Sequence, residues 1–147
     1  RRKNMVRRTL VVAVDFDGTC VDHRYPEVGT DVPGAATALS LIAQYGARII
    51  LYTMRSDNDQ HGAVLANAVE WFADRDIPLW GVNQNPEQYQ WTRSPKVYAH
   101  VYVDDAAFGC PLIDLPGFAR PVVDWAVVGP AICQRIEREA IAAIPVI

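Results

Sequence analysis

A continuous apolar run from Leu10 to Val14 most constrains how this chain can fold. The run does not alternate with polar residues, which is typical of a strand buried on both faces within a parallel sheet. Asp15, Asp17 and Gly18 follow directly, so they should lie just past the carboxyl end of the strand, where open α/β sheets bind ligands. Two carboxylates held close together repel each other unless a proton or a cation lies between them. The run therefore predicts a metal site, and Gly18 permits a tight turn beside it. Taken alone, the same residues also suit an ordinary strand-ending turn, because Asp and Gly both favour turns.

Strands and helices are predicted to alternate along the rest of the chain. The expected elements are a helix from Asp31 (its cap) through Pro33 to Gly46, a strand over 47–52, a helix over 59–73, an edge strand over 77–83, a strand over 97–103, a short strand over 122–125 and a helix from Pro130 to Ala143. A strand–helix–strand succession implies right-handed crossovers and parallel neighbours. The pattern therefore indicates an α/β fold.

Polar residues follow the other predicted strands as they follow the first. Thr53 comes after the strand over 47–52, and its hydroxyl can bind a phosphate oxygen, while Arg55 can add a guanidinium clamp. Asp104 and Asp105 end the strand over 97–103. Because the carboxyl ends of parallel strands meet at one sheet edge, we expect these groups to lie near Asp15.

A loop over residues 20–32 is expected to cover this edge, because it is polar, rich in Pro and Gly, and without periodicity. Its His23 and Arg24 are placed to meet a substrate, although exposed loop residues of this kind are more often plain surface. The residues predicted to contact substrate are Gly18, Thr19, His23, Arg24, Thr53 and Arg55.

The run Asp-Phe-Asp-Gly-Thr from Asp15 to Thr19 resembles the first motif of the haloacid-dehalogenase superfamily of phosphohydrolases. Thr53, Lys96 and the Asp104-Asp105 pair stand where the later motifs of that superfamily are expected. The resemblance implies that Asp15 is a nucleophile and Asp17 a general acid/base. It also implies that Thr53 and Lys96 stabilise the transferring phosphoryl group, although a lysine before its strand has to reach the site from a loop.

The resemblance further implies a Mg²⁺ cofactor held by the carboxylate of Asp15, the backbone carbonyl of Asp17 and an acid of the last motif. We expect Asp104 to be that ligand in preference to Asp105. Hard oxygen ligands and a phosphate partner suit Mg²⁺. The implied fold is a three-layer Rossmann-like parallel sheet with helices on both faces. The intervals from Thr19 to Thr53 and from Thr53 to Lys96 leave no room for a cap domain.

Composition bounds the remaining expectations. The chain has 147 residues, half of them hydrophobic, and a net charge of −3, which predicts one domain over residues 9–147 without an overall preference for nucleic acid or membranes. Residues 1–8 are expected to be a basic tail. Three cysteines without Cys-x-x-Cys spacing favour reduced thiols, and no signal peptide or membrane-length segment is recognisable. A cytoplasmic location is therefore expected.

These features together predict a Mg²⁺-dependent phosphomonoester hydrolase that acts through an aspartyl-phosphate. The substrate is expected to be a nucleotide or nucleic-acid end phosphate, with a small sugar phosphate as the alternative, and a homo-oligomer could close the open site. A non-catalytic scaffold with the same fold stays open as a second class. A receiver domain is disfavoured because the third strand ends in Asn83 and not in an aspartate.

Overall fold

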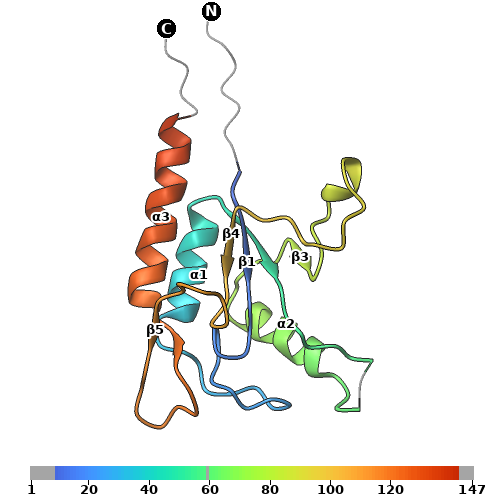
Figure 1. The fold of residues 1–147 in the computed structure, drawn as a ribbon, viewed down its shortest axis with the longest axis vertical. Coiled ribbons are helices and arrows are strands. Elements are labelled where there is room, and N and C mark those ends of the chain that lie inside the picture. Colours follow the sequence, from blue (N-terminus) through green and yellow to red (C-terminus); the bar gives the residue numbers. More distant parts are fainter. Residues whose placement is uncertain (1–8, 59, 143–147) are drawn as a thin grey trace, which may run out of the picture.

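The computed structural model describes residues 9–58 and 60–142 of the chain (Figure 1). A parallel four-stranded sheet forms its centre, in the order β3-β2-β1-β4. The strands are β1 (Val11–Val14), β2 (Arg48–Leu51), β3 (Gly81–Val82) and β4 (Val101–Val103). All four residues of β1 are buried, and Val12 is paired with Ile49 on one side and Val101 on the other. The predicted parallel α/β fold, with β3 at an edge, is confirmed.

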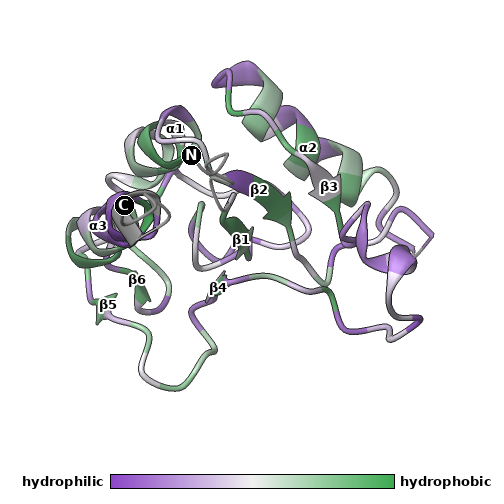
Figure 2. Ribbon diagram, turned by 90° about the horizontal axis from the view of Figure 1, so that it is seen from above, coloured by the Kyte–Doolittle hydropathy of each residue, from purple (hydrophilic) through white to green (hydrophobic). Residues whose placement is uncertain are grey.

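The three helices pack on one face of the sheet and not on both. They are α1 (Ala35–Gln44), α2 (Val64–Asp74) and α3 (Trp125–Ala142). Val12 and Val14 of β1 belong to the main core with residues of all three helices. Val11 and Ala13 point to the opposite face, where Val97 and Ala99 cover them. The segment between β3 and β4, which contains the short helix η1 (Gln88–Gln90), therefore supplies the third layer (Figure 2).

All three helix starts differ from the sequence expectation. Helix α1 begins after Gly34, and Asp31 is not its cap; Asp31 instead accepts hydrogen bonds from Trp71 Nε1 and from Arg75. Helix α3 begins at Trp125, so Pro130 lies inside it, where it removes one backbone hydrogen bond. Helix α2 begins at Val64 and not near residue 59, which itself lies outside the described residues.

A separate antiparallel hairpin links β4 to α3. It consists of β5 (Leu112–Ile113) and β6 (Val122–Val123). The strand predicted over residues 122–125 thus forms outside the main sheet. Strand β6 lies against the turn after β1, because Val123 N–H donates to Gly18 O at 3.1 Å.

Within the described ranges, the intervals between the strands hold only α1, α2, η1 and loops, so no inserted domain covers the end of β1. The predicted basic tail over residues 1–8 lies outside these ranges. None of the described helices has the length and apolar character needed to cross a lipid bilayer.

Candidate acidic metal and catalytic site

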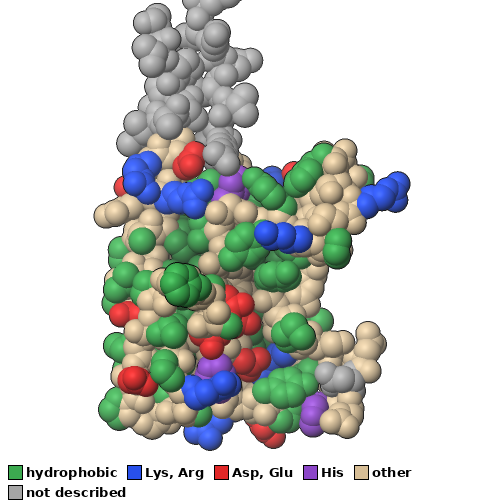
Figure 3. Space-filling model, in the orientation of Figure 1, with side chains coloured by type: hydrophobic (Ala, Val, Ile, Leu, Met, Phe, Trp, Pro, Cys, Tyr) green, Lys and Arg blue, Asp and Glu red, His purple; other side chains and the backbone are tan. Residues whose placement is uncertain are grey.

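Three carboxylates converge at the carboxyl end of β1 and β4. Asp15 directly follows β1, and Asp104 and Asp105 directly follow β4. The two strands are parallel neighbours, and Asp15 N–H donates to Val103 O at 2.9 Å. One oxygen of each carboxylate lies within 4.8 Å of the others. Figure 3 shows acidic side chains gathered on this face, with histidine and basic groups below them.

Ionisation of Asp15 is disfavoured in this group of three acids. Burial, the charge of Asp104 and a hydrogen bond to Asp105 raise the pKa of Asp15 from 3.8 to about 8, although the Thr19 hydroxyl acts in the opposite direction. Desolvation and like charges both disfavour a carboxylate anion. A bound divalent cation would relieve both effects, so the group has the character of a metal site.

Thr19 positions two of these acids from the interior. Its side chain is completely buried. The Thr19 hydroxyl donates to Asp15 Oδ2 at 2.9 Å, and the oxygen of this hydroxyl accepts the N–H of Asp105 at 3.3 Å. The indole of Trp125 donates to Thr19 O at 2.7 Å. The predicted direct contact between Thr19 and substrate does not fit this burial; Thr19 instead links the ends of β1 and β4.

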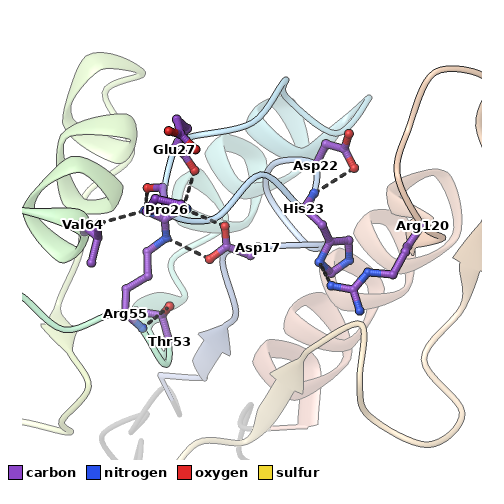
Figure 4. A network of polar contacts seen from close by, with 9 residues as sticks. All are labelled: Asp17, Asp22, His23, Pro26, Glu27, Thr53, Arg55, Val64 and Arg120. Carbon is purple, nitrogen blue, oxygen red and sulfur yellow. Dashed lines mark hydrogen bonds and ion pairs between the residues drawn. The ribbon is translucent and has the colours of Figure 1, made fainter. Parts of the chain in front are cut away.

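Arg55 holds Asp17 and is itself buried. Its Nε and Nη2 donate to the two oxygens of Asp17 at 2.8 and 2.7 Å (Figure 4). Its remaining donors bind the carbonyl oxygens of Pro26, Glu27 and Val64. A guanidinium has five N–H donors, and all five are used here. Arg55 therefore has no donor left for a phosphate, so the predicted clamp is replaced by a structural hold on Asp17.

His23 is brought to the acidic group, whereas Arg24 is not. His23 Nε2 lies 3.1 Å from Asp105 Oδ2, and its Nδ1 lies 2.8 Å from Nη2 of Arg120. Arg24 is largely exposed and lies 3.5 Å from Asp22 Oδ2. The two neighbouring loop residues, which were predicted together as substrate contacts, thus have different surroundings.

Thr53 lies at the expected sheet edge, after β2. Its N–H donates to Asn83 Oδ1 at 2.8 Å, and its hydroxyl oxygen accepts the N–H of Arg55 at 3.1 Å. The hydroxyl proton is not used in these contacts. Lys96, in contrast, precedes β4, and its ammonium lies over the Tyr102 ring at 5.9 Å from the centroid. The structure does not bring Lys96 into contact with the acidic group.

Gly18 is required by the packing of the His23–Asp105 pair. Its φ is +84°, and a Cβ at this position would overlap both His23 Nε2 and Asp105 Oδ2. Its N–H donates to Val21 O at 2.7 Å, so this amide closes the turn and does not point to a substrate, contrary to the sequence expectation.

We expect Gly18→Ala to destabilise the fold more than Gly46→Ala does. Gly46 also has a positive φ, of +100°, but a Cβ there would meet nothing within 4 Å. Both variants should lose about 1 kcal/mol through backbone strain, and only Gly18→Ala should lose a further 1–3 kcal/mol, roughly, through overpacking. Free energies of unfolding from denaturant titrations would measure the difference. Equal losses would show that the pair does not constrain position 18.

Sequence reasoning did not assign four residues that support the site. They are Asp22, Asn83, Arg120 and Trp125. All four contact partners at least 30 positions away, and Asp22 reaches Ala119 across 97 positions. No local sequence pattern predicts contacts between residues so far apart in the chain. For Asp22, the sequence offered one signal, because this acid directly precedes His23, a predicted contact residue.

Comparison with known proteins gives one informative relative. A solved structure of a conserved protein from Bacteroides thetaiotaomicron is 32% identical in sequence, and the match covers 87% of this chain and 93% of that one, with a TM-score of 0.68. No protein-family model and no curated protein matches the chain. The likeness thus extends over nearly the whole of both chains.

Proposed function

The chain belongs to the same family as the conserved Bacteroides protein, and we propose that it is a Mg²⁺-dependent phosphomonoester hydrolase of the haloacid-dehalogenase type. The observation that carries the proposal is the convergence of Asp15, Asp104 and Asp105 within 4.8 Å. Asp17 follows Asp15 by two residues on the turn after β1, and Thr53 follows the adjacent strand β2. Acids and a hydroxyl at one edge of a parallel sheet are the groups that phosphoryl transfer needs.

The donor chemistry fits Mg²⁺. Three carboxylates offer hard oxygen ligands of the kind this ion prefers, and the raised pKa of Asp15 reflects its burial and the negative charge of Asp104. We assign Asp15 and Asp104 as carboxylate ligands and Asp17 as a ligand through its backbone carbonyl. Asp105 contacts His23 and is not assigned as a ligand. When bound, Mg²⁺ would neutralise the carboxylates and the phosphate oxygens so that an anionic nucleophile can approach phosphorus.

Asp15 supplies the nucleophile in this proposal. One of its carboxylate oxygens forms a bond to phosphorus while the bond between phosphorus and the ester oxygen breaks. Thr19 donates to Asp15 Oδ2, which leaves Oδ1 as the oxygen free of this constraint. The hydrogen bond therefore favours Oδ1 as the attacking oxygen.

Asp17 transfers the protons. It gives a proton to the departing ester oxygen and then accepts one from the water that attacks the phosphorus of the aspartyl-phosphate. This second attack breaks the bond between Asp15 and phosphorus, and it releases inorganic phosphate. The Thr53 hydroxyl donates a hydrogen bond to a phosphoryl oxygen and keeps its proton. The role of Lys96 as a second stabilising group stays a prediction, and it requires the ammonium to leave the Tyr102 ring.

The test is phosphate release from an aryl phosphate with Mg²⁺ and with excess chelator. The wild-type protein should release phosphate only with Mg²⁺, and Asp114→Asn should behave like the wild type. Asp114 is an exposed acid in the loop between β5 and β6, so this variant controls for the loss of one negative charge. Binding of Mg²⁺ without release from any aryl or alkyl phosphate would contradict the hydrolase assignment and favour the scaffold alternative.

A further inference from the structure

Arg120 reaches the acidic site from a part of the chain to which the proposed chemistry assigns no role. It lies in the loop between β5 and β6. Its Nη2 is 2.8 Å from His23 Nδ1, and the other ring nitrogen of His23 is 3.1 Å from Asp105 Oδ2. His23 thus lies between the guanidinium, which Figure 4 shows beside the imidazole, and Asp105. The imidazole of His23 therefore separates a positive group from Asp105, which directly follows the proposed metal ligand Asp104.

One buried carboxylate fixes both members of this arginine–histidine pair. Asp22 is 2% exposed. Its Oδ1 accepts the N–H of His23 at 2.8 Å and the N–H of Ala119 at 3.1 Å. Ala119 directly precedes Arg120 in the chain. The backbone that carries the guanidinium is therefore anchored to the backbone that carries the imidazole, and the position of the cation is set before any ligand binds.

The charge of Arg120 is not balanced by the contact that positions it. A guanidinium can only donate hydrogen bonds, so His23 Nδ1 accepts and the ring proton lies on Nε2, facing Asp105. An aspartate lies within ion-pair distance of each of three other arginines, Arg24, Arg55 and Arg75. Among the described residues, no carboxylate lies within ion-pair distance of Arg120. Its side chain is exposed and keeps further donors.

We propose that Arg120 forms a subsite for a second anionic group on the substrate, a phosphate or a carboxylate. This inference rests on the proposed function, because it takes the phosphoryl group at Asp15 as the first anchor. Phosphate and carboxylate both match the planar fork of a guanidinium, which binds them through two parallel hydrogen bonds. The substrate class is accordingly a bisphosphate or a phosphorylated carboxylic acid, and a monophosphate with an uncharged remainder is a poor substrate.

Binding of non-hydrolysable phosphonates tests the subsite without requiring turnover. The probes are alkylphosphonates, ω-phosphonocarboxylates and α,ω-bisphosphonates with spacers of two to five methylene groups, titrated calorimetrically in the presence of Mg²⁺. We expect the wild type to bind at least one doubly anionic series about tenfold or more tightly than the matched alkylphosphonate, as a charge-assisted hydrogen bond would provide. The preferred series identifies the second group as phosphate or carboxylate.

Variants assign the preference to Arg120. Arg120→Gln should reduce the preference to within about twofold, and Arg120→Lys should retain part of it, because it keeps the charge but not the fork. Arg93→Gln, at an exposed arginine in the loop before β4, should keep the whole preference. Equal affinity for mono- and dianionic probes across all spacers in the wild type would overturn the subsite. So would an Arg120→Gln variant that weakens every probe equally, because Arg120 would then act only through His23 and Asp105.

Hydrolysis of the corresponding phosphate esters separates the two proposals. An Arg120-dependent preference among phosphonates without hydrolysis of any ester would leave the anion subsite standing and remove the hydrolase. Equal hydrolysis of propyl phosphate and propane-1,3-diyl bisphosphate, unchanged in Arg120→Gln, would leave the hydrolase standing and remove the subsite.

Discussion

Replacing Asp15 by Asn is expected to abolish phosphate release and to stabilise the metal-free protein at neutral pH. An amide oxygen is too weak a nucleophile for phosphorus, so kcat should fall by roughly a thousandfold or more. The stability effect has a different origin. Burial and the neighbouring carboxylates of Asp104 and Asp105 raise the pKa of Asp15 to about 8. Asn cannot ionise, and it still offers an oxygen to the Thr19 hydroxyl.

The sign of the pH dependence follows from the raised pKa. Between about pH 4 and pH 8 the folded metal-free protein keeps a proton on Asp15 that the unfolded chain has released. Its contribution to stability is therefore fully present below pH 4, and it is lost as the pH rises toward 8. The slope approaches about 1.4 kcal/mol for each pH unit. This part of the slope should be missing in Asp15→Asn.

Chelator-treated wild type, Asp15→Asn and Asp114→Asn should be compared by denaturant unfolding at pH 5, 6, 7 and 8. We expect Asp15→Asn to gain stability relative to the other two as the pH increases. The added Mg²⁺ should stabilise the wild type most at pH 8, where the carboxylate is most readily ionised. If the stability of all three proteins changed with pH in the same way, the raised pKa of Asp15 would be refuted. Full activity in Asp15→Asn would refute the nucleophile.

The elements that the sequence predicted well are those whose signal is local. The run from Leu10 to Val14 is buried because every side chain is apolar, and Asp15 must then emerge at the strand end. The parallel sheet also determines that Thr53 and Asp104 follow strands at the same edge. For these residues, local pattern and topology suffice, and no distant contact has to be known.

The predictions that failed concern residues whose role is set by a partner far away in the sequence. Asp31 looks like a helix cap, but it accepts hydrogen bonds from Trp71 and Arg75, 40 and 44 positions later. Arg55 looks like a phosphate ligand, but Asp17 and three carbonyls use all its donors. The face of the sheet opposite the helices is covered by the segment around Val97, which has no helical pattern. Single-residue propensities carry no information on such pairings.

The buried pair of Arg55 and Asp17 is expected to be worth much more than an exposed pair of the same geometry. The structure offers a matched comparison, because Arg75 also spans both oxygens of Asp31. The side chains of Arg55 and Asp17 are 1% and 21% exposed, against 31% and 43% for Arg75 and Asp31. Arg55→Met should cost roughly 3–5 kcal/mol, and Arg75→Met about 1 kcal/mol or less. Unfolding titrations at constant Mg²⁺ would measure both.

The functional part of this prediction concerns the orientation of Asp17. Arg55→Lys keeps a positive charge, but a single ammonium cannot span both carboxylate oxygens and also bind the carbonyls of Pro26, Glu27 and Val64. We expect this variant to recover part of the lost stability and to leave Asp17 poorly oriented. An alkoxide leaving group needs a proton from Asp17, whereas an activated aryl oxide can depart without one.

Arg55→Lys should therefore lower kcat for an alkyl phosphate by about tenfold or more relative to its effect on a nitrophenyl phosphate. The comparison is internal to one protein preparation, so a fraction of unfolded protein lowers both rates equally and cancels in the ratio. Arg75→Lys serves as the control and should not change the ratio. A ratio that is equal in the wild type and in Arg55→Lys would mean that Arg55 stabilises the loop over residues 20–32 without orienting Asp17.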